Sequence, residues 1–251
     1  MSKLNQPSLV VALASAALLT SNPAVAQEKD GWSGEASFSA GHTTGNTDTT
    51  DVGLGIDVAR EQGLWTYEFV ADGEYGEQDG IESRNRYFLS GDVDRLLNEK
   101  LFAFGRTSYE VDQFTGFDSR SFVGGGLGYH IFDGEQIKWT VRGGPGVKID
   151  EVKRTVTTDS LGAPLIIPAE TESSFGAVAR SAFGYKFNDN VKLTNETDVL
   201  YGENMVALTA SVSTSISARV SYNVRYDTNP ADGFEDTDTA LKVALVYGFG
   251  Q

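Results

Sequence analysis

Apolar and polar residues alternate with a period of two along most of the chain after residue 31. In an extended strand this period places apolar side chains on one face and polar side chains on the other. Polar or glycine-rich turns separate twelve such segments. They span residues 32–40, 51–58, 65–74, 86–94, 101–112, 120–131, 137–149, 175–187, 191–201, 206–214, 219–226 and 239–251. The pattern therefore predicts an all-β chain of about twelve strands joined as successive hairpins.

The last segment indicates how the strands are arranged. Small or polar residues alternate with its apolar face, which carries Leu241, Val243, Leu245, Tyr247 and Phe249. An apolar edge strand at the end of a soluble sheet invites aggregation. In a closed transmembrane barrel the last strand pairs with the first, and no edge remains. We therefore predict a transmembrane antiparallel up-and-down β-barrel that this closing strand completes.

The connections between the segments form two alternating sets. One set is short and covers residues 61–63, 96–100, 133–136, 188–190 and 215–218. The other is generally longer and covers residues 42–49, 76–83, 113–118, 151–171 and 228–237, with 202–205 as the exception. Short turns at one rim and longer loops at the other are typical of outer-membrane barrels. Tryptophan and tyrosine residues recur towards both ends of the segments, which predicts two interfacial belts.

Two stretches depart from regular alternation. Pro145 cannot donate a hydrogen bond to a strand ladder, so we expect a bulge at residues 143–146. Residues 151–171 contain two prolines and form the longest expected irregular segment.

The N-terminal residues resemble a secretory signal. Lys3 supplies a positive charge, residues 9–19 form a short apolar run, and Ala24-Val25-Ala26 has the small-x-small pattern of a cleavage site. We expect cleavage between Ala26 and Gln27, which leaves a signal peptide at 1–26 and a barrel at 27–251. No stretch approaches the ~20 apolar residues of a transmembrane helix.

Charge and composition narrow the function classes. Acidic residues exceed basic residues by 15 among 251 residues, which argues against a nucleic-acid partner. The chain has no cysteine, so its stability must come from strand pairing rather than from disulfides. Both features fit a barrel in the outer membrane of a Gram-negative bacterium.

Charged residues inside the predicted strands are the candidate functional residues. Facing lipid near mid-bilayer would cost roughly 2–4 kcal/mol for each Arg or Lys, so they are expected to line the lumen. The cations are Arg86, Arg106, Arg120, Arg142, Arg180 and Arg225, and the carboxylates are Glu68, Asp72, Asp92, Glu110 and Asp112. They are expected either to plug the lumen with salt bridges or to line a water-filled channel. The mixed signs favour a narrow or occluded lumen.

Catalysis and the binding of nucleotides, cofactors or metals are weakly supported by the sequence. Of the two histidines, only His42 has acidic neighbours at one rim, Asp48 and Asp51, so a hydrolase would have to use His42. The glycine row at 124–128 lies inside a strand and is not a nucleotide-binding loop. Without cysteine or paired histidines, neither a cofactor nor a metal is expected. The carboxylates of residues 227–238 match no calcium loop and are expected to be a solvated acidic surface.

Several motifs of the chain resemble the salt-induced outer-membrane proteins, the domain-of-unknown-function 481 family. The resemblance covers the expected mature chain and is strongest over residues 84–131. The motifs are Arg86–Gly91, Leu101–Phe104, Tyr109–Phe114, Ser119–Tyr129, Gly45-Asn46-Thr47 and the terminal Leu245–Phe249. The resemblance implies an outer-membrane barrel, with expression in some relatives linked to salt or acid stress. It implies no activity, substrate or catalytic residue.

The sequence thus predicts a monomeric, non-enzymatic outer-membrane barrel with a structural or narrow-pore role. Its expected partners are outer-membrane lipid, lipopolysaccharide and, during insertion, the barrel assembly machinery. Three alternatives remain: a channel for ions or small solutes with a charge-lined lumen, a soluble periplasmic β-sandwich that binds a ligand, and an envelope hydrolase that uses His42.

Overall fold

The computed structural model describes residues 31–43, 49–158, 164–199, 203–226 and 237–250. Fourteen β-strands account for nearly all of them. Among these residues, no helix has the length and hydropathy that a membrane span needs. The strands are β1 (Gly31–Thr43), β2 (Thr49–Gln62), β3 (Trp65–Gln78), β4 (Ile81–Leu96), β5 (Leu101–Asp112), β6 (Phe117–Asp133), β7 (Ile137–Val152), β8 (Thr155–Thr158), β9 (Pro164–Ile167), β10 (Glu170–Asn188), β11 (Val191–Asp198), β12 (Glu203–Ser211), β13 (Ile216–Tyr226) and β14 (Thr237–Phe249).

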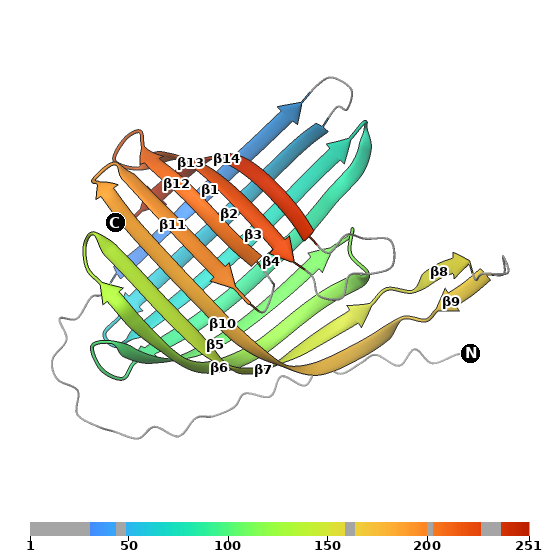
Figure 1. Cartoon of the computed structure of the whole chain (residues 1–251), viewed down its shortest axis with the longest axis horizontal. Coiled ribbons are helices and arrows are strands. Elements are labelled where there is room, and N and C mark those ends of the chain that lie inside the picture. The colour runs from blue at the N-terminus through green and yellow to red at the C-terminus, as the bar shows by residue number, and fades with distance from the viewer. Residues whose placement is uncertain (1–30, 44–48, 159–163, 200–202, 227–236, 251) are drawn as a thin grey trace.

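Twelve of these strands form one closed antiparallel barrel (Figure 1). Around the ring the order is β1-β14-β13-β12-β11-β10-β7-β6-β5-β4-β3-β2. Each barrel strand therefore pairs with the barrel strands before and after it in the chain, β7 pairs with β10 past the β8–β9 segment, and β14 pairs with β1 to close the wall. The prediction of a barrel of about twelve strands is confirmed, and the alternative of a soluble β-sandwich is wrong.

The predicted irregular segment at 151–171 is partly wrong. Residues 155–158 and 164–167 pair as a two-stranded sheet, β8 with β9. This ribbon continues from the ends of β7 and β10 and projects away from the barrel (Figure 1). Pro164 begins β9, which is a position that a proline tolerates because a strand end needs no ladder donor.

The predicted bulge at 143–146 is also wrong. β7 pairs with β10 in one unbroken register that includes Pro145 opposite Ala177. The register between β7 and β6 is the same on both sides of Pro145, with Gly146 opposite Gly124 and Gly143 opposite Leu127. The ladder tolerates the missing donor without inserting a residue. The register shifts lie elsewhere, near residues 76–77, 117–119, 130–132 and 186–188.

Two connections are tighter than the sequence predicted. The loop expected at 76–83 is a two-residue turn, Asp79-Gly80, and both residues have positive φ, at 51° and 74°. A hairpin of this length favours such a turn because its twist matches that of the strands. His42 also lies in β1 rather than in a loop, although its side chain is outside the described part of the structure.

The junction between β1 and β14 gives a first prediction. Phe249 is opposite Gly34, and a Cβ atom added at Gly34 would lie 2.7 Å from Cζ of Phe249, so the ring packs over the glycine. Replacing Phe249 with Ser should lower the yield of folded protein, because the packing of one aromatic ring is worth about 1 kcal/mol. The heat-modifiable gel shift of outer-membrane fractions measures this yield. Phe175→Ser, on the exposed face of β10, is the matched control, and equal yields for the two variants would contradict the prediction.

Candidate functional site in the barrel lumen

Ion pairs between strands that are not neighbours identify the inner face of the barrel. Arg106 of β5 lies 3.5 Å from a carboxylate oxygen of Asp198 on β11, and three strands separate β5 from β11 in the ring. Arg142 of β7 lies 3.0 Å from Asp92 and 3.4 Å from Asp94, both on β4. Two strands separate β7 from β4. Such contacts are possible only through the interior, so these side chains lie in the lumen.

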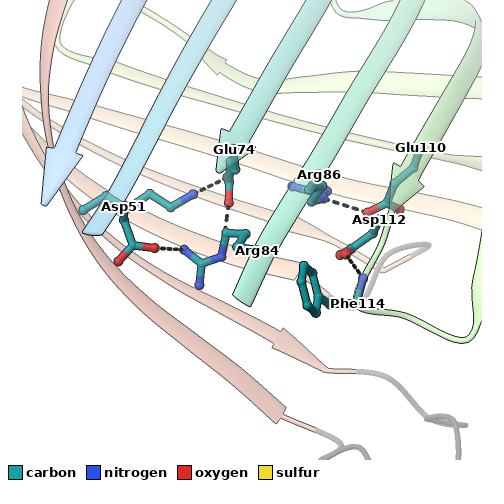
Figure 2. Close-up of polar contacts among 8 residues, drawn as sticks. Asp51, Glu74, Arg84, Arg86, Glu110, Asp112 and Phe114 are labelled. Carbon is teal, nitrogen blue, oxygen red and sulfur yellow. Dashed lines mark hydrogen bonds and ion pairs between the residues drawn. The ribbon is translucent and has the colours of Figure 1, made fainter. Parts of the chain in front are cut away.

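Two further ion-pair groups cross the lumen from β1 and β3. Glu35 of β1 pairs with Lys192 of β11 at 3.3 Å and with Arg219 of β13. Lys242 of β14 pairs with Glu74 of β3, and two strands separate β14 from β3 in the ring. Arg84 lies 3.8 Å from Glu74 and 3.4 Å from Asp51, and Figure 2 shows the three side chains facing one another. Ion pairs therefore link several different parts of the inner wall across the lumen.

These ion pairs require a barrel that is far from circular. In a circular twelve-strand barrel, strands a third of the way round the ring lie on the order of 20 Å apart. An Arg and an Asp side chain placed end to end do not reach that far, yet Arg106 and Asp198 meet. β6 and β10, which β7 separates, also approach each other. The walls at β5 and β11 thus lie close together, the wall is folded sharply at β7, and the lumen is narrow between them.

An apolar cluster fills the sharp fold. Phe102, Phe104, Phe122 and Val178 share the inner face with the charges, and each is at most 6% exposed. The sequence pattern had assigned only polar residues and glycines to this face. The guanidinium of Arg142 lies over the rings of Phe102 and Phe104, at 5.7 and 5.5 Å. Stacking on these rings orients Arg142 towards the β4 carboxylates.

The glycine row makes room for this cluster. A Cβ atom at Gly128 would lie 2.1 Å from the ring of Phe102, and one at Gly146 would lie 2.3 Å from the ring of Phe122. At Gly126 a Cβ atom would meet the backbone oxygen of Gly143 at 2.2 Å. These glycines therefore allow the aromatic rings, and the backbones of the paired strands β6 and β7, to approach closely.

The structure places the predicted lumenal charges as follows. Arg86 donates to Glu110 at 2.7 Å (Figure 2), and Arg180 donates to Glu196 at 2.9 Å. The guanidinium of Arg120 lies 3.7 Å from the ring centre of Phe117. Asp112 accepts a hydrogen bond from the backbone N–H of Phe114 at 2.9 Å, so it shapes a turn. Glu68 and Asp72 are half-buried on the inner face of β3, and Arg225 lies in β13, with its side chain outside the described part.

Three cations that cross the lumen were absent from the predicted set: Lys192, Arg219 and Lys242. They occupy the polar positions of their strands, so the same alternation could have found them. The predicted set also left out the carboxylate of Asp198, which receives Arg106.

The two signs of charge are distributed unevenly on the inner wall. The inner face of β1–β3 carries Glu35, Asp51, Asp57, Glu68, Asp72 and Glu74, and no described cation. The opposite part of the ring, β6, β7 and β10, carries the cations Arg120, Arg142, Lys148 and Arg180, together with Asp150, which pairs with Lys148. Asp57 is exposed although it faces inward, so water reaches the lumen along the acidic wall.

The described residues offer little that resembles a catalytic or metal centre. Nδ1 of His130 lies 3.0 Å from the hydroxyl of Thr140, and its ring packs on Phe102. No group of three or more described His, Asp or Glu side chains is arranged to hold a metal ion. The side chain of His42 and most of the acidic segment 227–238 lie outside the described residues.

A closed antiparallel barrel with an apolar exterior and a charged interior defines the class of outer-membrane β-barrels. The chain belongs to the family described as "Protein of unknown function, DUF481", whose model matches residues 36–249. The predicted family is therefore confirmed. No curated protein matches the chain in sequence.

Solved structures share the fold at low sequence identity. The translocator domain of the autotransporter NalP from Neisseria meningitidis aligns with a TM-score of 0.51 and 11% identity, over 88% of this chain and 89% of that one. The COG4313 outer-membrane channel from Pseudomonas putida F1 gives a TM-score of 0.47 and 13% identity over 89% and 97%. The NanC porin gives 0.45 and 12% over 86% and 98%. These similarities concern the fold alone.

Proposed function

We propose that this protein is a resident outer-membrane barrel that conducts small inorganic ions through a narrow, ion-paired lumen. The observation that carries the proposal is the set of ion pairs across the lumen, above all Arg106 with Asp198 and Arg142 with Asp92. They hold opposite walls together, so no wide passage like that of a ~16-strand porin remains. The protein is not an enzyme in this proposal.

Exposure of Asp57 favours a residual water path over a fully filled interior. Asp57 and the half-buried Glu68 lie on the acidic wall, on adjacent strands. No ion pair or side-chain hydrogen bond joins either one to another described residue. A path along carboxylates that form no ion pair with a described residue favours cations over anions.

The proposal includes the route to the membrane. The mature chain begins at Gln27 after signal cleavage, and the barrel assembly machinery inserts it as a monomer. It then contacts outer-membrane lipid and lipopolysaccharide. The small-x-small pattern at Ala24–Ala26 and the belt of apolar side chains outside the barrel support this route.

Conductance in planar bilayers tests the proposed function. We expect small current steps and a reversal potential in a salt gradient that favours K⁺ over Cl⁻. Asp57→Asn together with Glu68→Gln should reduce this preference, whereas Glu99→Gln in a short turn should leave it unchanged. Large steps that an oligosaccharide-sized polymer can block from inside would overturn the narrow lumen. Folded barrels that give no steps would favour the purely structural role instead.

A further inference from the structure

Two arginines sit among aromatic rings on the outer surface of the barrel. The girdle patch consists of Trp32, Arg60, Trp65, Tyr67 and Arg95, at the short-turn ends of β1–β4. In the strand register Trp32 is opposite Arg60, Arg60 is opposite Tyr67, and Trp65 is opposite Arg95. Each guanidinium lies over a tryptophan, Arg60 at 5.1 Å from the Trp32 ring and Arg95 at 5.4 Å from the Trp65 ring. The rings of Trp65 and Tyr67 stack at 6.3 Å.

The alternation of side chains between the two faces of a strand places the girdle patch outside the barrel. On β2 Asp57 faces inward, so Arg60, three residues later, faces outward. On β4 Asp92 faces inward, so Arg95 faces outward by the same rule. Trp32 and Tyr67 are 57% and 41% exposed, as surface side chains should be. These two cations therefore face the membrane at the depth where aromatic belts form.

No residue in the described part of the chain provides a counter-charge for either arginine. Most arginines of the inner wall pair with a carboxylate, whereas no described side chain forms an ion pair with Arg60 or Arg95. The Nε atom of Arg95 is covered and has no acceptor in the described part of the chain. An arginine without a counter-charge at a membrane interface is costly, so an anion from outside the protein should complete the site at the guanidinium donors that are not covered.

We propose that the girdle patch binds the phosphate of an anionic phospholipid headgroup in the inner leaflet. The short turns of outer-membrane barrels face the periplasm, which places the patch in that leaflet. A guanidinium matches the oxygens of a phosphodiester with two parallel hydrogen bonds. The flanking indole and phenol rings fit the interface between headgroup and acyl chain. The inference is independent of conduction through the lumen.

Native mass spectrometry of the purified full-length barrel tests the site. Detergent micelles are doped with equal amounts of phosphatidylglycerol and phosphatidylcholine, and the lipid retained on the folded barrel is counted. The wild type should retain phosphatidylglycerol in preference. Each interfacial cation contributes roughly fivefold to the binding of an anionic lipid, so Arg60→Gln with Arg95→Gln should weaken retention about 25-fold. Arg154→Gln, an exposed arginine outside the girdle patch, is the charge-matched control.

The outcomes separate this proposal from its alternatives. Substituting Lys at both positions keeps the charge but loses the paired hydrogen bonds, so an intermediate loss is expected. Equal retention of the two lipids by the wild type would overturn the proposal. Equal losses in the Gln pair and in Arg154→Gln would also overturn it, because net charge alone would then explain binding. So would a protein dimer that disappears with the Gln pair while lipid retention stays constant. The heat-modifiable gel shift confirms that each variant is folded.

Discussion

Replacing Ala36 with Arg should destabilise the barrel strongly, whereas the same replacement at the next residue, Ser37, should not. Ala36 lies on the outer face of β1, opposite Ile56 and Tyr247, whose side chains are 50% and 55% exposed. Ser37 lies on the inner face of the acidic wall. Near mid-bilayer an Arg against lipid costs roughly 2–4 kcal/mol. In the lumen the same Arg gains carboxylate neighbours, so its cost should be small.

Urea titration of both variants refolded in liposomes measures the difference. Both positions carry a small side chain on one strand at adjacent depths, so side-chain size and location are matched. A shift of one residue in register moves every side chain of a strand to the other face. Equal losses of stability, or a larger loss for Ser37→Arg, would therefore show that the register of β1 is wrong.

The barrel could be predicted from sequence because one physical signal repeats along the whole chain. A wall one layer thick, with lipid outside and water or charges inside, imposes a period of two on every strand. The fifth segment, predicted at 101–112, has these same bounds in the structure. Closure followed from the apolar last strand, which would otherwise be an exposed edge.

The signals that failed were local. Asp79-Gly80 is a strong hairpin signal, yet its polar neighbours led to a loop prediction at 76–83. β8 and β9 have four residues each, which is too few for alternation to distinguish a strand from a loop. At Pro145 the general rule against proline in a sheet gave the wrong answer, because the ladder simply omits one donor.

The candidate site could be predicted only in part. The alternation along each strand identifies which side chains face inward, but the ion-pair partner of each one depends on the shape of the closed barrel. Nothing in the sequence near Arg106 indicates that it meets Asp198, because that contact requires the walls at β5 and β11 to lie close together. Phe102 and Phe122 occupy inner positions, where the alternation of apolar and polar residues predicts polar side chains. The neighbouring glycines are the one sequence feature that could have indicated an internal apolar cluster.

Removing Arg142 should also lower the stability of the barrel strongly, because the carboxylates near Arg142 lose their closest cation. The side chain of Arg142 is 11% exposed and that of Asp92 is 2% exposed, so both are largely withdrawn from water. Arg142→Met keeps an unbranched apolar chain on Phe102 and Phe104 but leaves the carboxylates of Asp92 and Asp94 short of a partner. Removing one member of a buried ion pair costs about 3–5 kcal/mol.

A double variant separates this electrostatic cost from lost packing. Asp92→Asn combined with Arg142→Met removes the closest ion pair of the group and should recover part of the stability, because replacing a buried pair is close to neutral and Arg106 keeps its pair with Asp198. Arg84→Met is the control, since the side chains of Arg84 and of its partner Asp51 are 38% and 48% exposed and the pair should be worth at most about 1 kcal/mol. Urea titrations in liposomes give the three stabilities. If the double variant were no more stable than Arg142→Met, then packing of Arg142 on the phenylalanines, rather than its charge, would be what holds this part of the lumen together.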